Sequence, residues 1–292
     1  MISLNETLSF MQDHPYANKK AVLTTKHKKA SLIAPALSQT LRIELMEHSA
    51  DTDQLGTFSG EIERLLSPLE TAVLKARIGI NDLGVSLGFA SEGSIGRDPL
   101  IPFIQSDIEI LVLVDVENNL VISQAYRSFD ITAGQIVAKR DEDLSDFLEK
   151  VDFPNHKLIV RPNQGSSPSA IKGISNSQEL SEAINLCAPR SSDGTVLIES
   201  DLRAHCSPSR QNNIREAAKL LARRVLSQCP QCQMPGWGNV GYERGLNCSL
   251  CGMNVAKAAK REIFGCYKCE YREFGMQIAE NADPAKCDWC NP

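Results

Sequence analysis

Short apolar runs alternate with stretches of helical periodicity over the first 228 residues of the chain. Runs that are rich in Val, Ile and Leu and bounded by turn residues predict β-strands. Two of these runs flank the turn residues Asn118 and Asn119, and this pattern predicts a β-hairpin over residues 107–126. The predicted strands are residues 21–25, 85–90, 107–115, 120–126, 158–162 and 195–200.

Apolar side chains spaced three and four positions apart predict helices between these strands. The clearest helix follows Ser67, because Pro68 suits the first helical position and Glu70 completes a capping box with the serine. Its predicted buried stripe is Leu69, Ala72, Val73, Ala76 and Ile80. Other helices are expected with Ser31 as the N-cap, over residues 177–187, and through Ile214 towards Val225.

Strands that alternate with helices predict an α/β fold with a mixed sheet. We expect an N-terminal α/β region over residues 1–152 and a second α/β region over residues 153–228, either continuous with the first or separate from it. Residues 229–292 are rich in paired cysteines and are expected to form a small tandem zinc-ribbon domain.

The zinc prediction rests on cysteine spacing. Eight of the ten cysteines form four Cys-x2-Cys pairs. Fifteen residues separate the first pair from the second, and seventeen separate the third pair from the fourth. Two such pairs close a tetrahedral four-thiolate site, which favours two structural Zn2+ ions over redox pairs or an iron–sulfur cluster. Sequential pairing is expected, with crossed pairing as the alternative. The predicted ligands are Cys229, Cys232, Cys248, Cys251, Cys266, Cys269, Cys287 and Cys290.

Composition narrows the class of protein. The chain has 292 residues, with 42% hydrophobic and 23% charged residues, which is typical of a globular protein. It contains no apolar run of about 20 residues and begins without a basic signal segment, so we expect a cytoplasmic protein that does not contact a membrane. The formal net charge is −5, and two Zn2+ (+4) with eight thiolates (−8) bring it to about −9. Such an acidic chain is a poor binder of nucleic acid.

An acidic, glycine-rich stretch at residues 51–64 carries the candidate chemistry. Its carboxylates would repel one another unless a divalent cation such as Mg2+ or Mn2+, or a cationic ligand, offset the repulsion. A solvated loop explains the same composition equally well. The candidate catalytic residues are Asp53, Glu61, Glu63 and Glu92, the last after a predicted strand. The candidate substrate-binding residues are Lys26, Lys28, Thr57, Ser59, Arg64, Lys75, Arg203 and His205.

A second polar cluster lies further along the chain and would complete the same cleft, bind the far end of a substrate, or form a structural ion-pair network. Its members are Arg161, Lys172, Asp201, Arg203, His205 and Arg210. Two cysteines lie outside the zinc pattern: Cys187 is expected to be a buried small side chain, and Cys206 is a weak candidate nucleophile.

Two resemblances follow from these motifs. One set of motifs consists of the segments around Thr24–Lys26, residues 51–64, Glu92 and Asp201–His205, together with the four cysteine pairs. This set resembles a bacterial family defined by a domain of unknown function that ends in a double zinc ribbon. The first 100 residues more weakly resemble the pyrophosphatases that act on inosine and xanthosine triphosphates. The matching segments are residues 22–26, 69–76 and 88–93, although Ser91-Glu92 stands where the commoner branch has paired aspartates.

The resulting hypothesis is a metal-dependent hydrolase of a nucleotide or other phosphoester, with a small phosphorylated ligand as its substrate. The alternative is a non-enzymatic zinc-ribbon adaptor that binds protein or RNA. A third hypothesis, an enzyme that processes nucleic acid, requires a basic stripe through Arg203, Arg210, Arg223 and Arg224.

Overall fold

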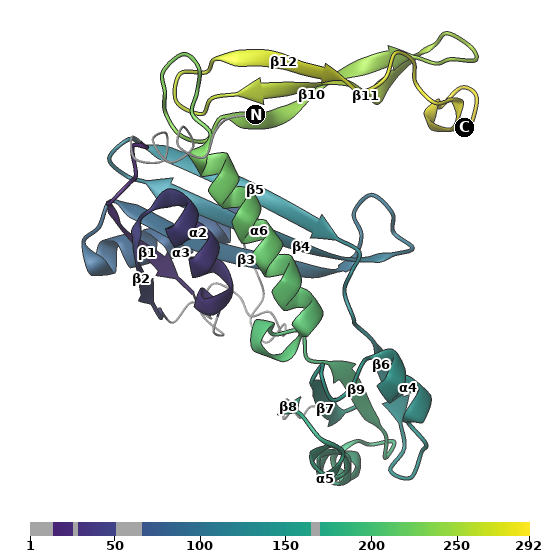
Figure 1. The fold of residues 1–292 in the computed structure, drawn as a ribbon. Coiled ribbons are helices and arrows are strands. Elements are labelled where there is room, and N and C mark those ends of the chain that lie inside the picture. Colours follow the sequence, from purple (N-terminus) through teal and green to yellow (C-terminus); the bar gives the residue numbers. More distant parts are fainter. Residues whose placement is uncertain (1–13, 26–28, 51–65, 165–169) are drawn as a thin grey trace.

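The computed structural model describes residues 14–25, 29–50, 66–164 and 170–292. Three sheets organise these residues (Figure 1). The fold is therefore the expected mixed-sheet α/β body followed by a cysteine-rich strand region. In the described part of the chain, no helix is both long enough and apolar enough to cross a bilayer.

The main sheet has the strand order β2-β1-β3-β4-β5. Strand β1 runs parallel to its neighbours β2 and β3, whereas the pairs β3–β4 and β4–β5 are antiparallel. The predicted hairpin is confirmed as β4 and β5. The strands are β1 (Lys20–Thr24), β2 (Glu44–His48), β3 (Leu87–Arg97), β4 (Gln105–Asp115) and β5 (Leu120–Ser128).

Helices cover both faces of this sheet because successive side chains of a buried strand point to opposite sides. Leu87 and Phe89 of β3 join the core under α2 (Ala30–Leu41) and α6 (Pro208–Leu226), whereas Ala90 joins the core under α3 (Pro68–Leu83). Helix α2 begins at Ala30, so the N-cap position belongs to Lys29 and not to the expected Ser31.

Helix α3 confirms its predicted start. The Ser67 side chain accepts a hydrogen bond from the Glu70 amide, the Glu70 carboxylate accepts one from the Ser67 amide, and Pro68 is the first helical residue. Ala72, Ala76 and Ile80 of the predicted stripe are buried against the sheet, although Leu69 is exposed.

A second, four-stranded antiparallel sheet has the order β6-β9-β7-β8 and its own core. The expected boundary at residue 152 falls inside this unit, between α4 and β7, and helix α6 then returns to the main sheet. The elements are β6 (Gln135–Ala138), α4 (Ser145–Lys150), β7 (Leu158–Pro162), β8 (Ile171–Ile174), α5 (Ser177–Cys187), η2 (Ala188–Arg190), β9 (Val196–Ser200) and η3 (Ala204–Cys206).

The cysteine-rich region is a three-stranded antiparallel meander that projects from the C-terminal end of α6 (Figure 1). We refer to residues 229–292 as the arm. Its elements are β10 (Gly238–Asn247), β11 (Asn254–Gly265), β12 (Arg272–Gln277) and the short η4 (Pro284–Lys286).

Candidate functional site

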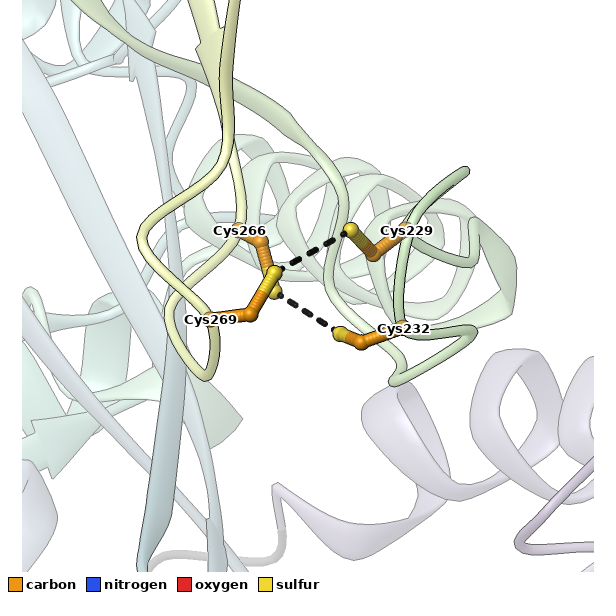
Figure 2. A group of neighbouring side chains, drawn as sticks. All are labelled: Cys229, Cys232, Cys266 and Cys269. Carbon is orange, nitrogen blue, oxygen red and sulfur yellow. Dashed lines mark hydrogen bonds between the residues drawn. The ribbon is translucent and has the colours of Figure 1, made fainter.

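The eight paired cysteines form two clusters, one at each end of the arm. In the cluster next to α6, the Sγ atoms of Cys229 and Cys269 lie 3.7 Å apart, and those of Cys232 and Cys266 lie 3.6 Å apart (Figure 2). We call this cluster the proximal site. These separations are far longer than a disulfide bond of about 2 Å. They match the edge of about 3.8 Å that a tetrahedron of thiolates has around Zn2+ at about 2.3 Å.

The second cluster, the distal site, has the same geometry. Cys248 and Cys290 place their Sγ atoms 3.8 Å apart, and Cys251 and Cys287 place theirs 3.7 Å apart. Leu246, Val255 and Ala282 form a small apolar core beside it. Both clusters are compatible with a structural Zn2+ ion.

The expected sequential pairing of the cysteine knuckles is wrong. The first knuckle joins the third, and the second joins the fourth, which is the crossed arrangement. The strand directions explain this result, because β10 leads away from α6, β11 returns and β12 leads away again. The first and third knuckles therefore meet at one end of the meander, and the second and fourth meet at the other.

Backbone amides favour the thiolate form of one cysteine in each of two knuckles. The amides of Cys251 and Leu250 point at the Cys248 sulfur and lower the pKa of its thiol to about 7. Burial acts against ionisation at Cys266, but the amides of Cys269 and Lys268 outweigh it and bring the pKa of that thiol to about 7 as well. Thiolates are the form that binds Zn2+, so these amides favour ligation near neutral pH.

The proximal site is tied to the main sheet. Arg224 at the end of α6 donates to the carbonyl oxygens of Gly236 and Asn239, at 2.6 Å each. Lys268 in the third knuckle donates to the Asn118 carbonyl in the β4–β5 turn at 2.8 Å, and Met234 packs against the main core.

A buried cluster of charged side chains lies at the other end of α6, beyond the carboxyl end of β1. Strand β1 pairs with β3 only as far as Thr24 and Ala90, and β3 then continues to Arg97. Ser91, Glu92 and Gly93 therefore lie at the edge of the sheet where β1 has ended. In open α/β sheets this edge, outside the carboxyl ends of the parallel strands, is where ligands bind.

Glu92 and Lys75 meet at this edge as an ion pair between β3 and α3. The carboxylate is buried, and only 13% of the Lys75 side chain is exposed. The sequence placed Glu92 after the end of a strand; instead, it lies in the middle of β3. The structure thus brings together two residues that the sequence nominated separately, one as a catalytic group and one as a substrate-binding group.

Three further charges complete the cluster on the α6 side of the sheet. Glu109 of β4 receives a hydrogen bond from Arg210 Nε at 2.6 Å, and its other oxygen lies 3.6 Å from Lys29 Nζ. Lys29 also donates to Ser91 Oγ at 3.3 Å. Burial lowers the pKa of the Lys29 ammonium, while the Glu109 carboxylate acts in the opposite direction. A side chain at Gly93 would overlap Glu109 and Arg210, so only glycine fits there.

Asp107 borders this cluster on the same face of β4. Asn213 of α6 donates to one of its oxygens at 2.9 Å, and the other oxygen has no hydrogen-bond partner among the described residues. Burial and the nearby Glu109 carboxylate raise the pKa of Asp107 to about 6. A carboxyl group that titrates near neutrality inside a charged cluster is typical of functional sites.

The second predicted cluster meets the first through Arg210. Its Nη1 donates to the carbonyl of Leu202 at 2.6 Å, and the neighbouring Arg203 forms an ion pair with the buried Asp201 at 2.6 Å. His205 lies in the following turn η3. Burial and the Asp201 carboxylate raise the pKa of the Cys206 thiol to about 11, which disfavours the nucleophilic thiolate form. Cys187 is fully buried, as predicted.

The remaining candidate residues for catalysis and substrate binding lie outside the described part of the chain. They are Lys26, Lys28, Asp53, Thr57, Ser59, Glu61, Glu63 and Arg64. The proposed basic stripe for nucleic acid is wrong, because Arg210 and Arg224 are buried and engaged by the protein itself. Sequence reasoning missed Lys29 and Glu109. The available signal for Glu109 was its position, with Asp107, on alternate residues of a strongly apolar strand.

A mixed α/β body with two four-cysteine sites defines the class as an α/β protein that carries a cysteine-rich arm suited to bind two Zn2+ ions. The chain belongs to the family DUF6671, a domain of unknown function, whose sequence profile matches residues 75–292. The match begins at Lys75 and includes Glu92, Glu109, Arg210 and all eight paired cysteines. The expected membership in such a family is confirmed. No curated protein matches the chain.

Proposed function

We propose that the protein hydrolyses a nucleotide or another phosphoester at the carboxyl end of β1. The buried pairing of Lys75 with Glu92, both within electrostatic range of the buried Lys29, is the observation that carries this proposal. Two lysines within a dry site would bind phosphate oxygens strongly, because charge–charge attraction grows as water is excluded. A bound phosphate would form an ion pair with Lys75 and leave the Glu92 carboxylate available to bind a cation.

The oxygen donors at the site suit a hard divalent cation such as Mg2+ or Mn2+. Glu92 would be its ligand, with Asp53, Glu61 or Glu63 as the further ligands that we expect. When bound, the cation would supply charge neutralisation and an acidified water molecule. The chain itself would hold the phosphate through Lys29 and Lys75.

The test is release of phosphate or pyrophosphate from a panel of nucleoside triphosphates, diphosphates and simple phosphoesters, with Mg2+ or Mn2+, by the zinc-loaded protein. We expect Glu92→Gln and Lys75→Met to reduce kcat/KM at least 100-fold. Glu243→Gln, which alters an ion pair on the arm, is the matched control and should retain activity. The proposal fails if no panel member is turned over, or if folded Glu92 and Lys75 variants keep the wild-type rate.

A second function, docking of a partner protein on the arm, is supported by apolar side chains that the arm leaves exposed. Phe274 and Met276 of β12 are both exposed, Met276 by 80%. The others are Leu250, Met253, Ile278 and Trp289. Monomeric proteins seldom gather so many large apolar groups on one small domain.

Affinity capture from cells with the wild type and with the double variant Phe274→Glu and Met276→Glu would test this alternative. A partner that binds the wild type and is lost with the double variant, but not with the control Lys257→Glu on β11, supports docking. Identical captured proteins for all three chains would contradict it.

A further inference from the structure

A groove runs between α2 and α6 on the main body, and none of its lining residues belongs to the charged cluster at the carboxyl end of β1. The two helices lie side by side (Figure 1). A hollow of about 410 Å³ opens between them. A second hollow of about 630 Å³ continues from the end of α6 to the first cysteine knuckle. Arg223 lines both, so the two hollows meet at this residue.

One wall of the groove is positively charged. Arg215, Lys219 and Arg223 are exposed and lie four residues apart on α6, so their side chains form a row with a spacing of about 6 Å. None of the described residues that line either hollow is an aspartate or a glutamate. The row therefore presents a local positive potential on a protein whose net charge is negative.

The rest of the lining is apolar or neutral apart from Cys229, whose thiolate would belong to the proximal site when zinc is bound. Leu32, Pro35 and Ala36 of α2 line the first hollow, and Leu226 and Pro230 line the second. The existing partners of the cations are weak, because Lys219 pairs with Glu216 at 2.6 Å on the exposed surface and Arg215 donates to Asn212. A ligand with carboxylates could replace these partners at little cost.

We propose that this groove binds an acidic peptide segment of a partner protein, with carboxylates facing the α6 row and apolar side chains facing α2. Glutamates four residues apart on a helix repeat at about 6 Å and match the spacing of the row. The apolar side chains of the segment would occupy the two hollows. This surface is distinct from the proposed hydrolytic site and does not depend on it.

Nucleic acid suits the groove less well. No aromatic side chain is among the described residues that line the hollows, so bases would find no stacking surface. A long polyphosphate chain would also be repelled by the acidic protein as a whole, whereas a short peptide interacts mainly with the nearby cations.

The proposal can be tested with the full zinc-loaded protein and a fluorescein-labelled peptide that carries glutamate at every fourth position with leucine and alanine between. Fluorescence anisotropy should show saturable binding that weakens with added salt. The triple variant R215E/K219E/R223E should bind at least tenfold more weakly. Glu216→Gln should bind severalfold more tightly, because it releases Lys219. The double variant K139E/R140E, on exposed residues of the second unit, should bind like the wild type.

Three results would overturn the proposal. The first is unchanged affinity of the triple variant when its zinc content and circular dichroism match the wild type. The second is equal binding of a peptide in which glutamine replaces every glutamate. The third is displacement of the peptide by single-stranded oligothymidine of equal charge at lower concentration than by the unlabelled peptide, which would assign the groove to nucleic acid.

Discussion

Glu109 holds two cations inside the protein. Its side chain is fully buried and contacts both Arg210 and Lys29, whose own side chains are almost fully buried. The substitution Glu109→Gln keeps the shape but removes the carboxylate that directly contacts both buried cations. We expect a loss of about 3–5 kcal/mol in the free energy of unfolding, measured by urea denaturation. Glu243→Gln on the arm should cost less than about 1 kcal/mol; equal losses for the two variants would contradict a special role for Glu109.

Asp107 should make stability depend on pH. Its pKa is raised from 3.8 to about 6 in the folded protein, so between these values the folded state holds a proton that the unfolded state has released. The stabilisation is therefore present at low pH and is lost as pH rises through about 6, by an amount on the order of 2–3 kcal/mol. The difference in unfolding free energy between wild type and Asp107→Asn should fall by this amount from pH 4 to pH 7. A difference that stays constant over this range would show that Asp107 titrates normally.

At the scale of elements, the strand meander makes the two four-cysteine sites unequal. The proximal site shares contacts with α6 and the β4–β5 turn, whereas the contacts of the distal site with described residues lie within the arm. We expect Cys287→Ser to remove one equivalent of zinc and to leave the thermal unfolding of the body nearly unchanged. Cys232→Ser should also remove one equivalent but should lower the unfolding temperature of the body.

Zinc content by mass spectrometry and unfolding by calorimetry would give both readouts. The crossed pairing makes a further distinction: Cys232→Ser should expose Cys266 and Cys269 to thiol reagents, whereas sequential pairing would expose Cys248 and Cys251. Labelling of Cys248 and Cys251 would contradict the observed pairing.

Some elements could be predicted from the sequence because their causes are local. Ser67, Pro68 and Glu70 specify the start of α3 within four residues, and the four knuckles specify metal chemistry by spacing alone. The pairing of the knuckles could not be predicted, because it depends on the direction of the strands between them. The apolar alternation of β10 to β12 is too weak to reveal those strands, since many of their side chains are exposed.

In the candidate site, too, the residue types could be predicted from the sequence, whereas their contacts depend on tertiary packing. Lys75 and Glu92 were identified by type and order, but their ion pair depends on how α3 packs on β3. Lys29 lies in a basic run with Lys26 and Lys28, and composition gives no reason to single it out. Its burial is a tertiary property, set by the end of β1 and by Glu109 on β4, which β3 separates from β1.

For the whole molecule, α6 is the element that connects the parts. Its first turn carries Arg210, which contacts both the main sheet and the segment after β9, and its last turn carries Arg224, which binds the arm. We expect Arg224→Met to loosen the arm because the carbonyls of Gly236 and Asn239 lose their donor. Hydrogen exchange should accelerate over residues 235–247 while exchange in β3 and β4 stays unchanged. Unchanged exchange in the arm would mean that the zinc site alone holds it in place.

The crossed pairing also fixes the order in which the arm can fold as the chain is synthesised. The proximal site needs Cys269 and the distal site needs Cys290, so neither is complete when the second knuckle emerges from the ribosome. A chain that stopped at residue 265 would have the four thiols of the first two knuckles but no complete four-cysteine site. With sequential pairing, the same chain would contain one complete site. Metal binding by the arm therefore depends on the part of the chain beyond residue 265.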